Sequence, residues 1–249
     1  MNILVLVKAV ADSEASIRPS ADGKSVALEG ISWIISPYDE YAIEEALKLR
    51  EADGTGEVAA VGFGGDEVPK VLRTALAMGV DRSVHVKGTA SFDPLATARV
   101  LAEAMKGMNT DLILCGKQAI DHDHGAVGIM VAELLDIPSV SVVTKLERDG
   151  SKLRLEREVE GGVEVVETNM PCLITCQKGL NEPRYASLKG IMAAKKKPLD
   201  EVAATAQDSR VEVIEIRSRP PRQGGEILGT GVDAVPLLVK KLKEEAKVI

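Results

Sequence analysis

The chain has 249 residues, of which 45% are hydrophobic, enough to form a large α/β domain alone or with a smaller appendage. Its formal net charge of −7 argues against general nucleic-acid binding, which requires a basic surface to neutralise phosphates. No apolar run reaches the roughly 18 residues that span a membrane. Three cysteines, an odd number, fit a reduced compartment better than a disulfide framework, so we expect a cytoplasmic protein.

Short β-rich runs alternate with amphipathic windows over the first 145 residues. We expect strands at 2–7, 31–35, 58–63, 83–86, 112–115 and 140–144, and helices at 37–52, 67–78, after 93 and at 125–135. Ser36 as N-cap, Pro37 at the first helical position and Asp39 three residues after the cap predict a start similar to a capping box. The alternation predicts parallel strands joined by right-handed crossovers, hence a three-layer, Rossmann-like open parallel α/β sheet.

The pattern changes after about residue 145. Two runs of alternating polarity, 152–159 and 163–169, are separated by Glu160-Gly161-Gly162, which predicts a β-hairpin, and a further strand is expected at 172–176. Residues 201–226 are polar and broken by prolines and glycines, which predicts an extended arm before a helix within 231–247. We therefore expect an α/β domain over 1–200, and over 201–249 an arm with a C-terminal helix. Such an arm has little core of its own and must be held by another surface.

A polar segment over residues 180–200 contains an isolated leucine and a short helix. Ser187 is the expected N-cap of a helix over 188–197, which Pro198 ends. This arrangement is typical of a loop that contacts another protein. The alternative is purely structural, because three lysines at the end of a helix complement its dipole and a leucine at its start usually packs inward.

The strongest candidate for a small-molecule site is the loop that follows the strand at 112–115. It contains Gly116, Lys117, Gln118, Ala119, Ile120, Asp121, His122, Asp123, His124, Gly125, Ala126 and Val127. Ligands of open parallel sheets bind beyond the carboxyl ends of the strands, where glycines at a helix start expose N–H groups to phosphate. We expect a nucleotide here, although a plain turn has the same composition. The His-x-His pair also offers zinc ligands, but a metal site needs three or four ligands in fixed geometry.

Four stretches of the chain resemble the β subunit of electron transfer flavoproteins. They are Ser36–Glu51, Arg73–Asp81, Gly116–Asp121 and Leu155–Lys197. The resemblance implies a heterodimer with an α subunit that holds most of an FAD. This agrees with the composition, since aromatic residues, which could stack on a flavin, make up only 2% of the chain. It also implies electron transfer from a flavin dehydrogenase, such as an acyl-CoA dehydrogenase, to an acceptor such as a membrane quinone oxidoreductase. The chain itself would catalyse no bond exchange.

The resemblance also implies roles for individual residues. An AMP site would comprise the loop from Gly116 to Val127 together with Leu6, Ser36, Pro37, Tyr38, Asp39 and Phe63. Tyr38 would also lie nearest to the shared FAD. The docking surface for the dehydrogenase, centred on Leu188, would comprise Arg184, Tyr185, Leu188, Ile191 and Met192. Glu158 would pair with an arginine of the mobile flavin domain of the α subunit. The C-terminal arm would wrap around the α subunit.

Two alternatives stay open. His122 and Tyr38 are similar to AMP-binding carriers, whereas Val127 and Gly128 are similar to a branch that holds a second FAD here and splits electron pairs between two acceptors. If AMP binds, Gly125 and Val127 supply no Asn or Thr side chain to the phosphate, so backbone N–H groups must do so. The other alternative is an ATP-binding regulatory module of the universal-stress type, which would leave the long arm unexplained.

Overall fold

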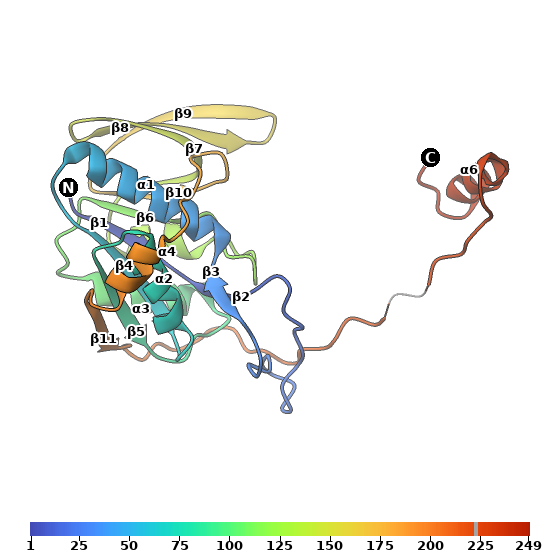
Figure 1. The fold of residues 1–249 in the computed structure, drawn as a ribbon, viewed down its shortest axis with the longest axis horizontal. Coiled ribbons are helices and arrows are strands. Elements are labelled where there is room, and N and C mark those ends of the chain that lie inside the picture. The colour runs from blue at the N-terminus through green and yellow to red at the C-terminus, as the bar shows by residue number, and fades with distance from the viewer. Residues whose placement is uncertain (222–223) are drawn as a thin grey trace.

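A nine-stranded sheet forms the centre of the computed structural model, which describes residues 1–221 and 224–249 (Figure 1). Its order is β11-β5-β4-β1-β6-β10-β7-β8-β9, and all neighbours from β11 to β7 are parallel. The hairpin strands β8 and β9 continue the sheet in antiparallel fashion. The strands are β1 (Ile3–Leu6), β4 (Val58–Gly64), β5 (Arg82–Lys87), β6 (Leu112–Gly116), β7 (Ser139–Asp149), β8 (Lys152–Val159), β9 (Gly162–Asn169), β10 (Cys172–Cys176) and β11 (Leu199–Ala203).

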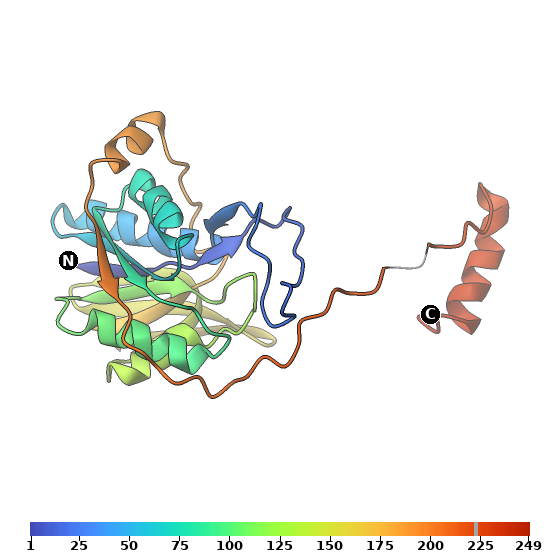
Figure 2. The same ribbon diagram turned by 90° about the horizontal axis from the view of Figure 1, so that it is seen from below.

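Helices cover both faces of this sheet (Figure 2). α1 (Pro37–Asp53) and α2 (Val68–Met78) bury their apolar sides on one face, and α3 (Pro94–Met105) and α4 (Val127–Leu134) do so on the other. Proline stands in the first turn of α1, α2 and α3, where its missing N–H is not needed. The predicted three-layer α/β fold and its hairpin are confirmed.

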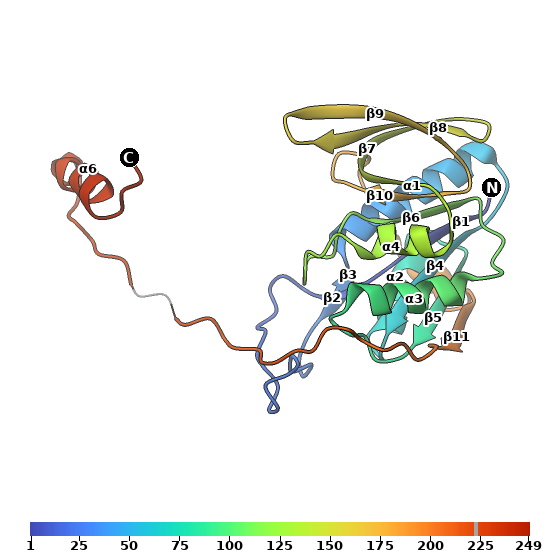
Figure 3. The same ribbon diagram turned by 180° about the vertical axis from the view of Figure 1, so that it is seen from behind.

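A short helix, α5 (Leu188–Ala194), packs on α2 and directly precedes β11 (Figure 2). The Oγ of Ser187 accepts a hydrogen bond from the N–H of Gly190 at 3.0 Å, so the predicted N-cap is confirmed. The helix ends at Ala194, three residues earlier than predicted. Beyond β11 the chain crosses the start of α3, where the N–H of Arg210 donates to Asp93 at 2.7 Å (Figure 3).

Three predictions about local structure were wrong. The strand near residue 31, β3 (Trp33–Ile35), pairs antiparallel with β2 (Ala9–Ala11) in a separate two-stranded sheet. β11 places residues 201–203 in the main sheet, whereas the sequence predicted an arm there. Ser36 occupies the N-cap position of α1, but its side chain makes no capping bond and Asp39 does not reach back to it. The capping box fails because distant backbone groups engage the carboxylate of Asp39.

The C-terminal part of the chain lies apart from the α/β body (Figure 1). It includes a single 3₁₀ turn, η1 (Val232–Ala234), followed by α6 (Val235–Glu244), none of whose residues is buried. The predicted arm over 201–226 includes residues 222–223, which lie outside the described residues. Among the described helices, none has the length and apolarity that crossing a membrane requires.

Candidate functional site

A buried carboxylate joins three segments at the carboxyl edge of the sheet. Asp39, in the first turn of α1, accepts hydrogen bonds from the N–H of Lys8 at 2.8 Å and from the N–H of Gly116 at 2.7 Å. Burial raises the pKa of Asp39 to about 7, and the two N–H donors act against this rise. Lys8 follows β1 and Gly116 ends β6, so this side chain holds the ends of two strands against the start of a helix.

The loop after β6 is ordered by its own hydrogen bonds. The N–H of Lys117 donates to the carbonyl of Cys176 at 2.9 Å, which ties the loop to the end of β10. Within the loop, the N–H of Asp123 donates to the carbonyl of Ala119 at 3.0 Å, and Nε2 of Gln118 donates to the Asp123 carboxylate at 2.8 Å. These bonds turn the chain back toward the sheet before α4 begins.

The N-terminus of α4 has the features of an anion site. Its N-cap is Ala126, which offers no side-chain acceptor, so the first-turn N–H groups are left for a ligand or solvent. Gly125, with φ of 60°, makes the turn into the helix without a Cβ in the way. Gly128 is required for packing, because a Cβ there would lie 2.5 Å from Sγ of Cys115.

Lys8 and the ring of Phe92 contact side chains of this loop. Nζ of Lys8 lies 2.6 Å from the carboxylate of Asp121 and 3.3 Å from Nδ1 of His122. The ring of His122 stands edge-on to Phe92, with centroids 4.7 Å apart, and stacks on His124 at 5.3 Å. Burial, and then the charge of Lys8, lower the pKa of His122, so its imidazole is neutral at pH 7.

Sequence reasoning missed Lys8 and Phe92. Lys8 had an available signal, since it directly follows the strand predicted at 2–7 and therefore stands at the edge of the sheet where ligands bind. Phe92 lies in the connection between β5 and α3, where no pattern marks it. On the other side of the loop, Nζ of Lys117 lies 5.2 Å from the ring centroid of Tyr38, as a cation–π pair.

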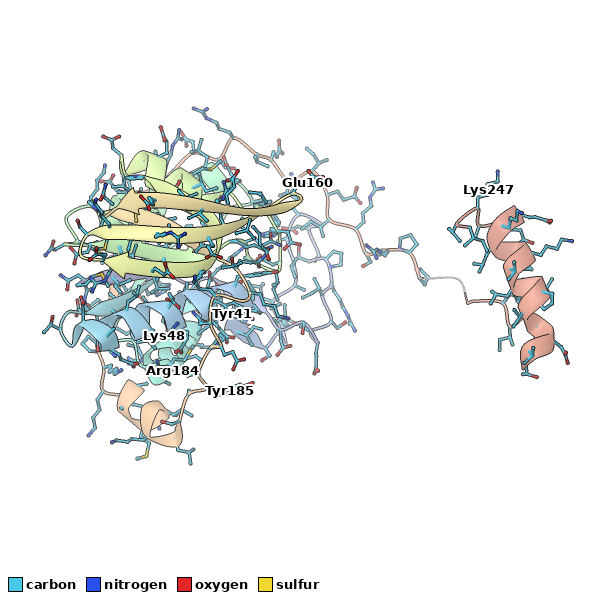
Figure 4. All side chains as sticks on the ribbon, turned by 90° about the horizontal axis from the view of Figure 1, so that it is seen from above. Tyr41, Lys48, Glu160, Arg184, Tyr185 and Lys247 are labelled. Atoms are coloured by element: carbon cyan, nitrogen blue, oxygen red, sulfur yellow. The ribbon has the colours of Figure 1, made fainter. Side chains whose placement is uncertain are left out.

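A second exposed region lies on the loop before α5 and on α5 itself. Tyr185 is 97% exposed, Leu188 84% and Met192 72%, and Ile191 also exposes nearly half its surface. Figure 4 shows Arg184 and Tyr185 on the segment that follows β10, passes α1 and leads to α5. Exposed apolar side chains in such a cluster are typical of a protein-binding surface. The inward packing of the leucine, left open from the sequence, does not occur.

Arg184 faces the body rather than solvent. Its guanidinium binds Glu44 at 2.7 and 2.9 Å and Glu51 at 2.7 and 3.2 Å, both on α1. These bonds raise the pKa of Arg184 and lower that of Glu51. Between this loop and the start of α1 lies a hollow of about 240 Å³ that Tyr41 and Tyr185 help to line.

The family model described as "Electron transfer flavoprotein domain" matches residues 24–207. The chain belongs to the electron transfer flavoprotein family. The protein named "Electron transfer flavoprotein subunit beta" from Bacillus subtilis is 44% identical, with 100% of both chains covered. The protein from Arabidopsis thaliana whose name adds "mitochondrial" is 40% identical, with 100% of both covered, and the one from Homo sapiens is 38% identical, with 100% of this chain and 99% of the relative covered. The resemblance to the β subunits is thus confirmed.

The family resemblance also assigns to the AMP site residues from three segments outside the loop. Pro37, Tyr38 and Asp39 adjoin the loop from Gly116 to Val127, together with Ser36, whose buried Oγ has no hydrogen-bond partner among the described residues. Leu6 is buried in the core of the sheet. Phe63 lines a cavity of about 250 Å³ between the end of β5, the start of α3 and residues 204–207.

None of the three cysteine thiols is an activated nucleophile. Cys115, Cys172 and Cys176 are all unpaired and buried. Burial raises the pKa of all three, that of Cys172 to about 11, so they remain protonated at neutral pH. Within residues 1–221 and 224–249, no group of three or more His, Cys, Asp or Glu is arranged to hold a metal ion.

Glu158 lies on the exposed side of the hairpin. Its carboxylate accepts a hydrogen bond from Nε2 of Gln177 at 2.8 Å. The tip of the hairpin, where Figure 4 labels Glu160, projects beyond the helices. Val163 and Val165 on β9 are also more than half exposed, so the hairpin presents both apolar and charged groups to its surroundings.

Proposed function

We propose that this chain is the β subunit of a heterodimeric electron transfer flavoprotein, which passes electrons from a flavin dehydrogenase, such as an acyl-CoA dehydrogenase, through FAD. The downstream acceptor in this proposal is a membrane quinone oxidoreductase. The observation that carries the proposal is the full-length similarity to proteins named as β subunits. The three unpaired thiols favour the cytoplasm as its location.

The α subunit is the proposed partner of the C-terminal segment. Every residue of α6 is at least partly exposed, including Val235, Leu237, Leu238 and Val239. An apolar helix side of this kind is stable in water only when another surface covers it. We therefore assign the segment after β11, which includes α6, residues 204–249, to the subunit interface, and residues 1–203 to the nucleotide-binding domain.

AMP is the proposed ligand of the loop after β6. The unpartnered Oγ of Ser36 and the uncapped N-terminus of α4 match the polar groups and the phosphate of a nucleotide. Lys8 and Lys117 add positive charge beside the loop. FAD, held mainly by the α subunit and nearest here to Tyr38, supplies the electron-transfer chemistry when bound.

This chain's own residues control position rather than reactivity. The loop around Leu188 docks the dehydrogenase, and Glu158 offers a carboxylate to an arginine of the mobile flavin domain. An ion pair between exposed groups contributes about 1 kcal/mol or less. That weakness allows a domain to leave its docked position after each electron transfer.

The competing proposal is a second FAD in place of AMP. It rests on Val127 and Gly128, which resemble the branch of the family that splits electron pairs. FAD is yellow whereas AMP is colourless, and the two proposals differ in the number of FAD molecules per heterodimer. The bound nucleotides therefore distinguish them.

The deciding experiment is to purify the chain with its α subunit, release the nucleotides with acid and quantify them. One FAD and one AMP per heterodimer is the expected result, and two FAD with no AMP would replace AMP by the second flavin. A colourless homodimer containing ATP would overturn the electron-carrier proposal in favour of the universal-stress type of module.

A further inference from the structure

We call the segment 181–197 the docking loop. Two basic side chains, one on α2 and one at the end of this loop, each bind the terminal backbone carbonyls of the other segment. Nη1 of Arg73, on α2, donates to the carbonyls of Ala194 at 2.6 Å and Lys197 at 2.9 Å. In return, Nζ of Lys197 donates to the carbonyls of Leu76 at 3.1 Å and Val80 at 2.6 Å, at the end of α2. Terminal carbonyls of each helix are therefore satisfied by a cation from the other segment.

Of the three consecutive lysines 195–197, only the last takes part in these bonds. Lys197 is half-buried and points to α2, so it does not serve the dipole of its own helix. Lys195 and Lys196 are exposed and, among the described residues, neither has an ion-pair partner. Lys189, on α5 itself, is also exposed, so three cations lie on the same short segment as the apolar side chains of the docking loop, which matches a partner surface that carries acidic groups.

The beginning of the docking loop is anchored separately, on α1. Arg184 binds Glu44 and Glu51, as described above, and Nδ2 of Asn181 donates to the carbonyl of Tyr41 at 3.0 Å and to Glu45 at 2.9 Å. The loop is thus fixed at both ends, whereas the side chains between the anchors are exposed.

Close packing leaves α5 little freedom to move relative to α2. A Cβ on Gly190 would lie 2.3 Å from the carbonyl oxygen of Ala77, so only glycine allows the observed distance. Ala194, the last residue of α5, is buried in the main core. The buried side of this short helix and its exposed side are therefore held in one orientation.

We propose that Arg73 is a positioning residue for docking: with Lys197 it holds α5 so that Leu188, Ile191 and Met192 are already arranged for the partner. The inference rests on the proposed function of this loop. A surface that is ordered before binding loses less conformational freedom, and its apparent affinity is proportional to the fraction of molecules in the competent arrangement. Arg73 itself lies behind α5 and does not touch the partner.

The test compares heterodimers carrying Arg73→Ala, Arg73→Lys and Gly190→Ala with one carrying Arg154→Ala. Arg154, on β8, pairs with Glu147 at 3.2 Å, so this control removes an arginine ion pair in the hairpin but leaves the bonds between α2 and the docking loop intact. Gly190→Ala displaces α5 without removing any charge, and it replaces Arg73→Ala if that variant fails to assemble.

The first readout is amide hydrogen exchange in residues 188–194, which reports on order without any partner. Arg73→Ala is expected to accelerate exchange of the Ile191 N–H, which donates to Ser187 at 2.9 Å, and Arg73→Lys to restore part of the protection. The second readout is steady-state electron transfer from a purified acyl-CoA dehydrogenase. If the competent fraction falls to about a tenth, KM for the dehydrogenase rises about tenfold at unchanged kcat and flavin content.

The outcomes separate this inference from the docking proposal. Unchanged exchange in Arg73→Ala would overturn the positioning role. So would an unchanged KM in Arg73→Ala when Leu188→Ala raises it, and in that case the docking role of the loop would stand. If Leu188→Ala also leaves KM unchanged, the docking proposal fails and the positioning role fails with it.

Discussion

Replacing Leu188 by alanine isolates the contribution of one exposed side chain to docking. The substitution removes three carbon atoms, which are worth about 2.4 kcal/mol when fully buried, at about 0.8 kcal/mol each. Leu188 is 84% exposed in the free chain, so nearly all of this surface is available for burial by a partner. The expected loss is about 2 kcal/mol, which is about a 30-fold rise in KM for the dehydrogenase.

The assay is steady-state electron transfer with the dehydrogenase varied, alongside flavin content and thermal unfolding of the heterodimer. Because Leu188 contributes little to the folded core, its replacement should change the free energy of unfolding by no more than about 0.5 kcal/mol. A matched substitution, Leu28→Ala, removes another exposed leucine outside the docking loop and should leave KM unchanged. Loss of flavin in Leu188→Ala, or a KM equal to that of Leu28→Ala, would refute the reasoning.

Three further predictions concern other parts of the chain. Gly128→Ala forces a Cβ against Cys115 and should lower the free energy of unfolding by about 1–3 kcal/mol; adding Cys115→Ala should recover part of the loss in thermal melts, and no recovery would contradict the contact. Deleting residues 235–249 should leave the melting of the α/β body unchanged but abolish copurification of the α subunit, and retention of that subunit would argue against α6 as its contact. Asp39 binds its proton more tightly in the folded than in the unfolded chain, so its stabilising contribution is complete below its unfolded pKa of 3.8 and is lost as pH rises through about 7. Relative to Asp39→Asn, which cannot ionise, Tm should therefore fall between about pH 4 and about pH 7, and a constant difference would exclude this titration.

The sheet and its covering helices could be predicted from the sequence because their signals are local. Short apolar runs bounded by glycine and polar residues predicted β1, β4, β5 and β6, and the helical periodicity between them predicted the crossovers. Only pairing partners are absent from such patterns. That is why β3 was assigned to the main sheet although it pairs with β2.

β11 shows a second limit of pattern reasoning. Asp200 and Glu201 stand side by side within it and four of its five residues are exposed, so it lacks the alternating polarity that marks a strand. An edge strand satisfies its backbone through one neighbour, here β5, without burying its side chains. The strand is therefore specified by a surface that the local sequence does not contain.

The candidate nucleotide site could be predicted only where its residues are contiguous. The loop from Gly116 to Val127 is one segment, so its composition and position are sufficient to make it a candidate. Asp39 was predicted to cap its own helix, but its partners, Lys8 and Gly116, are 31 and 77 positions away. Lys197 was grouped with its neighbours for the same reason, because its acceptors at the end of α2 are more than 110 positions distant.

β11 also sets the spacing between the two regions that we assign to other proteins. α5 comes just before this strand, and the arm begins directly after it. A strand of five residues is about 17 Å long, so the two attachments leave the body from opposite rims of the sheet. Under the proposed function, an electron donor seated at one rim would leave the other rim clear for the α subunit.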